Sequence, residues 1–265
     1  MQTLKATQGL EWIRGGWRIF GRGPMTWIFA VIAYWLIMAL AGLIPFLGPL
    51  LATLFIPAFA VSFMNISREL EQGRQVDPSL IFSGFRRNLP VLVQLGGIYL
   101  VSTLLILMLT QFADGGMLMK WMLFNEAPAE EEVDQSGLGG AVLIALALYL
   151  PVLMAFWFAP VLVAWQDMGA VKALFYSFFA CLRNWRPFLA YGFAWFFLGG
   201  LLPGTLGTGF AVAISGGEPN PAVSQTLLFG FLLLLVPTLF ASFYVSYRDI
   251  FAAPAPQPQG PEAQA

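Results

Sequence analysis

Six long apolar stretches without a charged side chain constrain this sequence more than any other feature. They cover residues 26–44, 50–66, 89–112, 138–165, 187–203 and 225–247. An α-helix needs about 20 predominantly apolar residues to cross the hydrocarbon core of a bilayer. Composition agrees, because 10% of the residues are charged against about 25% in a typical soluble domain. We therefore predict an all-α, polytopic bundle of six transmembrane helices in one domain, 1–252, followed by a disordered cytoplasmic tail, 253–265.

The distribution of basic residues predicts the orientation of this bundle. An even number of spans places both termini on the same side of the membrane. That side holds 12 of the 13 Lys and Arg residues, and the opposite side holds only Lys120. Basic residues concentrate on the cytoplasmic side of membrane proteins. We therefore expect a multi-pass protein of the bacterial inner membrane with both termini in the cytoplasm.

A threefold repeat is indicated by similar segments ahead of the odd-numbered spans. Each segment is rich in aromatic residues and reaches an Arg just before the span, at 17–24, 82–88 and 178–184. The even-numbered spans also end alike, with an acidic residue at Glu69, Asp167 and Asp249. Residues 9–22 carry apolar and basic stripes at helical spacing, as helices in the headgroup plane do. We predict three αα-hairpin repeats, each preceded by an interfacial amphipathic helix.

The segments 9–20, 45–49 and 82–88 also carry a resemblance to a known family. The chain resembles an uncharacterised family of six-span integral membrane proteins from Gram-negative bacteria, over nearly its whole length to Ala252. It is more distantly similar to the membrane domain ahead of some glycerophosphodiester phosphodiesterases. No catalytic domain follows here, so that activity is not carried over. The resemblance implies an integral inner-membrane protein without an assigned reaction.

Basic residues beside the spans are the first candidate site. The candidates for contact with anionic headgroups or with a partner are Arg14, Arg18, Arg22, Arg86, Arg87, Arg183 and Arg186. Each basic residue near an anionic surface contributes about 1 kcal/mol of attraction. In the alternative interpretation these residues only set the topology and anchor helix ends.

A glycine-rich stretch in the fifth span is the second candidate. Gly199, Gly200, Pro203 and Gly204 could break the helix and open a cavity, as discontinuous helices do in several transporters. Gly200 and Gly204 are also spaced to let another helix approach closely. In the alternative interpretation, the fifth helix simply ends here and a far-side loop follows.

Catalytic chemistry has no recognisable pattern in this chain. His is absent, Cys181 is the only cysteine, and the acidic run 130–134 is typical of a solvated loop. We expect no catalytic residue, no metal, no cofactor and no nucleic-acid partner. The predicted function is that of an accessory or scaffold protein that contacts anionic lipids or a membrane-protein partner, or forms a homo-oligomer. The alternative is a permease or lipid-handling transporter for a neutral or amphipathic solute.

Overall fold

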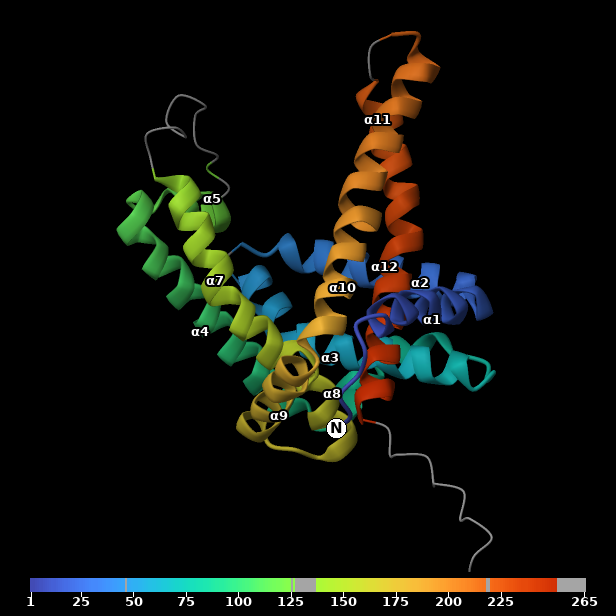
Figure 1. The fold of residues 1–265 in the computed structure, drawn as a ribbon, viewed down its shortest axis with the longest axis vertical. Helices are drawn as coiled ribbons and strands as arrows, with labels where there is room; N and C mark the ends of the chain where they lie inside the picture. Colours follow the sequence, from blue (N-terminus) through green and yellow to red (C-terminus); the bar gives the residue numbers. More distant parts are fainter. Residues whose placement is uncertain (46, 125, 127–136, 218–219, 252–265) are drawn as a thin grey trace, which may run out of the picture. The chain divides into compact units, whose positions relative to one another are not determined.

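The computed structural model describes residues 1–45, 47–124, 126, 137–217 and 220–251, and these residues form helices and turns without a β-strand (Figure 1). The acidic run 130–134 and the predicted tail 253–265 lie outside the described residues. Six helical segments are long and apolar enough to cross a membrane, as predicted: Pro24–Gly42, Leu47–Glu71, Leu89–Asp114, Leu138–Gln166, Trp185–Ile214 and Pro221–Phe251.

The six segments correspond to nine labelled elements, because two of them are interrupted. These are α2 (Pro24–Gly42), α3 (Leu47–Glu71), α4 (Leu89–Asp114), α7 (Leu138–Trp157), α8 (Ala159–Gln166), α10 (Trp185–Trp195), η2 (Phe196–Leu201), α11 (Leu202–Ser215) and α12 (Pro221–Phe251). The remaining described elements are α1 (Gln8–Arg22), η1 (Pro78–Arg86), α5 (Met117–Phe124) and α9 (Ala170–Arg183).

The chain divides into two compact units, which are described separately. The terminal unit comprises Met1–Arg18 and Asn184–Ala265, and the middle unit comprises Ile19–Arg183. The terminal unit therefore combines most of α1 with the last two membrane-capable segments. The middle unit contains the first four.

The middle unit is organised around α3. Helix α2 packs on α3 through Trp27, whose ring stacks on Phe63 at 6.1 Å between centroids. Helix α4 approaches the backbone of α3 so closely at Gly96 that a Cβ there would overlap Leu54. Only glycine has no Cβ, so these two helices meet almost backbone to backbone. Helix α3 begins at Leu47, three residues before the predicted start of the second span.

The fourth segment is interrupted beside Pro160. Proline lacks a backbone N–H and its ring clashes with the preceding helical turn. Helix α7 accordingly ends at Trp157, and Pro160 lies in the first turn of α8. The backbone N–H of Phe158 at the junction donates to Ser177 Oγ of α9 at 2.8 Å. Pro151, by contrast, lies inside α7.

The fifth segment does not end at residue 203. It passes through the wide π-turn of η2 and continues in α11 to Ser215. Pro203 lies in the first turn of α11, where proline is tolerated after the regular hydrogen-bond pattern has been interrupted. The structure therefore has a widened helical turn where the sequence predicted either a helix break or a helix end.

Asp114 connects the end of α4 to α5 and provides a test of this part of the fold. Its carboxylate is buried and accepts hydrogen bonds from the N–H groups of Gly116 at 2.8 Å and Leu118 at 2.7 Å. Loss of a capping side chain costs about 0.5–2 kcal/mol. We expect Asp114→Ala to lower the free energy of unfolding by about 1–2 kcal/mol, measured by thermal unfolding in detergent. Asp114→Asn keeps an acceptor oxygen and should lose less; equal losses would contradict the capping role.

Candidate functional site

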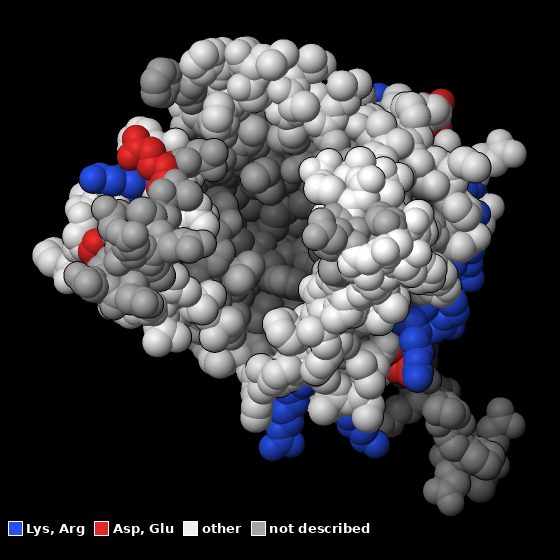
Figure 2. Space-filling view, turned by 90° about the horizontal axis from the view of Figure 1, so that it is seen from above, with Lys and Arg blue, Asp and Glu red and all other residues white. Residues whose placement is uncertain are grey.

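The seven predicted arginines are all exposed in the structure, and they are divided between the two units. Arg14, Arg18 and Arg186 belong to the terminal unit, whereas Arg22, Arg86, Arg87 and Arg183 belong to the middle unit. In the space-filling view of Figure 2, the Lys and Arg side chains that are visible lie at the surface. Their exposure makes these guanidinium groups accessible to a ligand.

Helix α1 is held against the last hairpin by glycines. A Cβ at Gly16 would lie 2.6 Å from both the N of Ser242 and the O of Thr238 in α12. A Cβ at Gly9 would come even closer to the carbonyl O of Pro187 in α10. Side chains at either position would push α1 away. The amphipathic helix predicted ahead of the first hairpin thus packs, within the terminal unit, on the third.

Aromatic and polar contacts complete this docking. Trp12 is fully buried, and its ring lies 5.1 Å from Phe188 and 5.8 Å from Tyr191 between centroids. Gln8 Nε2 donates to the Asp249 carboxylate at 2.8 Å. Asn184 Oδ1 accepts from the Leu4 N–H at 2.9 Å, while its Nδ2 donates to the Gln2 carbonyl at 3.0 Å. Hydrogen bonds and ring contacts therefore hold the N-terminal segment and α1 against the last hairpin.

One buried hydrogen bond joins α10 to α12 beneath α1. The hydroxyl groups of Tyr191 and Ser242 lie 2.7 Å apart. Hydrogen bonds between membrane helices contribute about 0.6 kcal/mol on average and up to about 1.7 kcal/mol. We expect Tyr191→Phe and Ser242→Ala each to lower the free energy of unfolding by about 1 kcal/mol. A double-mutant cycle in detergent should show coupling between them, and strictly additive losses would argue that the bond contributes nothing.

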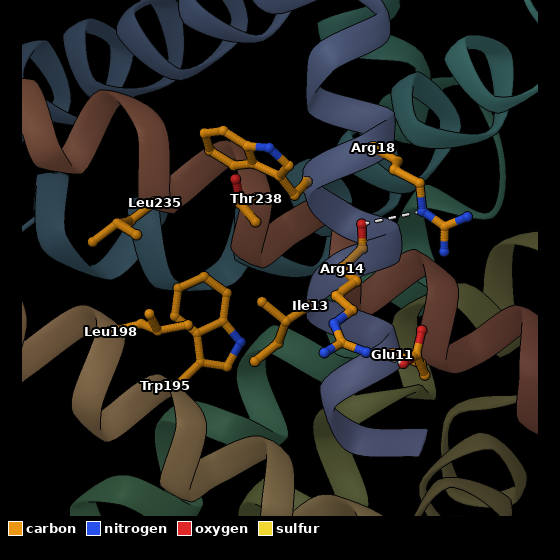
Figure 3. Close-up of a pocket in the computed structure, with 9 residues that line it drawn as sticks. Glu11, Ile13, Arg14, Arg18, Trp195, Leu198, Leu235 and Thr238 are labelled. Carbon is orange, nitrogen blue, oxygen red and sulfur yellow. Dashed lines mark hydrogen bonds and ion pairs between the residues drawn. The ribbon is translucent and has the colours of Figure 1, made fainter. Parts of the chain in front are cut away.

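A pocket of about 710 Å³ opens beside α1 within the terminal unit (Figure 3). Its walls come from α1, from α10 with the start of η2, and from α12. The residues lining it are Glu11, Ile13, Arg14, Trp17, Arg18, Trp195, Leu198, Leu235 and Thr238. The interior is apolar, and the charged residues all belong to α1. Arg14 and Arg18 are among the residues predicted from the sequence. The apolar residues of the walls were not predicted, because they look like ordinary membrane-spanning sequence.

The glycine-rich candidate does not form part of this pocket. Gly199, Gly200, Pro203 and Gly204 lie beyond Leu198 in η2 and α11, outside the lining residues. A Cβ added at Gly200 or Gly204 would meet no atom of another helix within 4 Å. The close helix approach expected at this pair is therefore not seen in the described part of the chain.

The middle unit has its own polar cluster at the start of α4. Arg87 Nη2 contacts the Asp167 carboxylate at 2.7 Å, and Asn88 Nδ2 donates to Asp167 at 2.8 Å and to the Val163 carbonyl at 2.9 Å. The hydrogen bonds from Arg87 and then Asn88 hold the pKa of Asp167 below its usual value. Asn88 and Asn184 are the last residues of the matching segments 82–88 and 178–184. The structure shows both amides binding a neighbouring segment.

A second cluster in the middle unit surrounds Trp165. The guanidinium of Arg68 lies over the Trp165 ring, 4.6 Å from its centroid, as in a cation–π contact. The indole N–H of Trp165 donates to Asn65 Oδ1 at 3.0 Å, and Asn65 Nδ2 donates to Ser83 Oγ at 2.9 Å. These contacts tie η1, α3 and α8 together and present no nucleophile with a paired base.

Metal and thiol chemistry receive no support from the described residues. No group of three His, Cys, Asp or Glu side chains that could hold a metal occurs among them. Cys181 is buried, and this burial raises the pKa of its thiol, which disfavours the reactive thiolate. Its burial fits a packing residue.

The six membrane-capable helices define the class of this molecule: it is a multispan helical membrane protein. No family model matches the chain, and no solved structure matches it. It is 37% identical over 260 residues to a probable inner membrane protein of Burkholderia thailandensis, covering 96% of this chain and 94% of that protein. The chain belongs to the same family of probable inner membrane proteins, in agreement with the resemblance found in the sequence.

Proposed function

We propose that this protein is a non-catalytic accessory or scaffold protein of the inner membrane that contacts anionic lipids, or a membrane-protein partner, through a basic cytoplasmic face. One observation carries the proposal: the seven arginines beside the predicted spans are all exposed. Exposed guanidinium groups can form bidentate contacts with phosphate.

Three docking contacts support a threefold hairpin repeat within this architecture. Gly16 of α1 lies against Thr238 and Ser242 of α12. Gly84 of η1 lies in the same way against Ala58 and Ser62 of α3, where its N–H donates to Ser62 Oγ at 2.9 Å. Thr238 and Ala58 each follow a proline directly, at Pro237 and Pro57.

The third contact involves a serine rather than a glycine. Ser177 of α9 donates to the Met154 carbonyl and accepts from the Phe158 N–H, both at 2.8 Å. In all three cases a small residue ahead of one hairpin packs on the second helix of a different hairpin. We propose that α1, η1 and α9 are the equivalent interfacial segments of three repeats.

Lipid composition around the reconstituted protein tests the proposed lipid contact. The protein is placed in nanodiscs of equal phosphatidylglycerol and phosphatidylcholine, and the lipids retained after mild extraction are counted by mass spectrometry. We expect enrichment of phosphatidylglycerol around the wild type and loss of that enrichment when the seven arginines are replaced by glutamine. Equal retention of both lipids by the wild type would overturn the lipid contact. A stoichiometric co-purifying protein would favour the partner instead.

Cysteine labelling tests the proposed orientation separately. With both termini cytoplasmic, an impermeant reagent added to intact spheroplasts should label Lys120→Cys but not Thr3→Cys or Gln264→Cys. Permeabilisation should expose the two terminal cysteines. Cys181 is buried and should give little background. Labelling of the termini in intact spheroplasts would contradict the proposed basic cytoplasmic face.

A permease for a neutral or amphipathic solute is the second candidate. The widened turn of η2 at Phe196–Leu201 favours it, since π-turns inside α-helices often occur at functional sites. This candidate predicts a small solute, rather than a phospholipid, among the molecules retained in the same extraction.

A further inference from the structure

We propose that the pocket beside α1 holds one acyl chain of an anionic phospholipid, with the phosphate of its headgroup against Arg14 and Arg18. This inference rests on the proposed lipid contact and narrows it to a single site in the terminal unit. A diffuse attraction of lipids to the basic face would require only charge. The proposed site requires the apolar walls and the guanidinium groups of Arg14 and Arg18 together.

The walls of the pocket suit a hydrocarbon chain. Ile13, Leu198 and Leu235 come from three different elements and all line the pocket (Figure 3). The hydroxyl of Thr238 donates to the Leu234 carbonyl at 2.8 Å, so its donor is already used. An occupant of this interior therefore finds dispersion contacts and few hydrogen-bonding groups. The volume of about 710 Å³ lies within the range of roughly 300–1,000 Å³ typical of small-molecule sites.

The charged edge of the pocket suits a phosphate. Arg14 and Arg18 are four residues apart on α1, so their side chains are neighbours on the helix surface. In Figure 3 the Arg14 side chain lies between Ile13 and Glu11, and the Arg18 side chain extends from α1 away from Leu198 and Leu235. Like charges at this spacing destabilise a helix, and an anion between them would remove that cost. Arg18 Nε contacts the Arg14 carbonyl at 3.4 Å, which leaves the terminal nitrogens of Arg18 available.

Glu11 neutralises only part of this edge. Its carboxylate meets Arg14 Nη1 at 2.5 Å, and the Arg14 side chain is 71% exposed. Exposed ion pairs of this kind contribute little free energy, so Glu11 does not prevent a phosphate from binding here. The combination of an apolar interior with a cationic edge favours a lipid of the bilayer over free phosphate, which would leave the apolar walls unused.

Native mass spectrometry with defined lipids tests the site. The full-length protein is released from nanodiscs of equal phosphatidylglycerol and phosphatidylcholine, and the fraction that retains one phosphatidylglycerol is measured. We expect Arg14→Gln/Arg18→Gln to reduce the apparent affinity for this lipid by about 30-fold, from the attraction of two basic residues near a surface. The control Arg74→Gln/Arg248→Gln removes the same charge from exposed positions that neither line the pocket nor belong to the seven proposed contact arginines, and it should keep the lipid.

A pocket-filling variant separates the apolar contribution from the charge. Leu235→Trp places a larger side chain in the pocket and keeps the charges of Arg14 and Arg18. It should reduce retention of both lipids. Leu228→Trp, on the same helix but outside the lining residues, is its matched control.

The outcomes distinguish the single site from the broader proposal. Equal losses in the two arginine pairs would overturn the single site while leaving the diffuse basic face intact. No preference for phosphatidylglycerol in the wild type would overturn both. Retention that survives Leu235→Trp in a folded protein would show that the acyl chain does not occupy this pocket.

Discussion

Replacing Gly16 by valine is expected to detach α1 from the last hairpin. A Cβ at this position meets two backbone atoms of α12 at 2.6 Å, the N of Ser242 and the O of Thr238. Backbone atoms cannot move aside by changing a rotamer, so the helix itself must shift. Overpacking of this kind costs about 1–3 kcal/mol and occasionally more. We expect the free energy of unfolding to fall by about 3 kcal/mol, measured by thermal unfolding in detergent.

Limited proteolysis gives this prediction a local readout. Residues 1–18 of Gly16→Val should become cleavable under conditions that leave the wild type intact. Gly21→Ala is the matched control on the same helix, because a Cβ there meets nothing within 4 Å. Alanine also favours the helix by about 1 kcal/mol relative to glycine. If both variants behaved like the wild type, α1 would not be held against α12.

Replacing Asn88 is expected to produce the second large effect. Asn88 has a backbone φ of 53°, in the left-handed region, and its side chain donates to the Val163 carbonyl at 2.9 Å. Left-handed backbone costs an alanine roughly 1–2 kcal/mol, and a lost hydrogen bond costs about 1 kcal/mol. We expect Asn88→Ala to lower the free energy of unfolding by about 2 kcal/mol in the same thermal assay.

Glycine at this position separates the two contributions. Asn88→Gly removes the side-chain hydrogen bonds but adopts the left-handed backbone without strain. It should therefore be about 1 kcal/mol less destabilising than Asn88→Ala. Equal losses in both variants would show that backbone conformation contributes nothing here.

The same variants should change the pH dependence of stability through Asp167. Its pKa is lowered by the hydrogen bonds of Arg87 and Asn88, so the folded state favours the ionised carboxylate. This contribution is present at neutral pH and is lost as the pH falls through the lowered pKa. In Asn88→Ala the pKa should move toward its usual value. The stability difference from the wild type should accordingly shrink in acid.

The candidate site could be predicted from the sequence only in part. Arg14 and Arg18 stood out because they belong to a basic stripe at helical spacing in residues 9–22. Trp195, Leu198 and Leu235 did not, since apolar side chains in a membrane span look alike whether they face lipid or line a pocket. Asn88 and Asn184 carried a recognisable signal in their matching positions, but their hydrogen-bond partners lie 75 to 182 residues away in the chain.

By itself the sequence determined the six membrane-capable helices and the class of the protein, because length and hydropathy are local properties of each stretch. The tertiary structure alone decided that α1 packs on the third hairpin and that the fifth segment continues past Pro203. It also decided which glycines of α1 are needed for packing. Gly16 and Gly21 are equivalent as local sequence, but only Gly16 meets the backbone of another helix. Such contacts depend on which surfaces meet in space, and no local pattern encodes the partner.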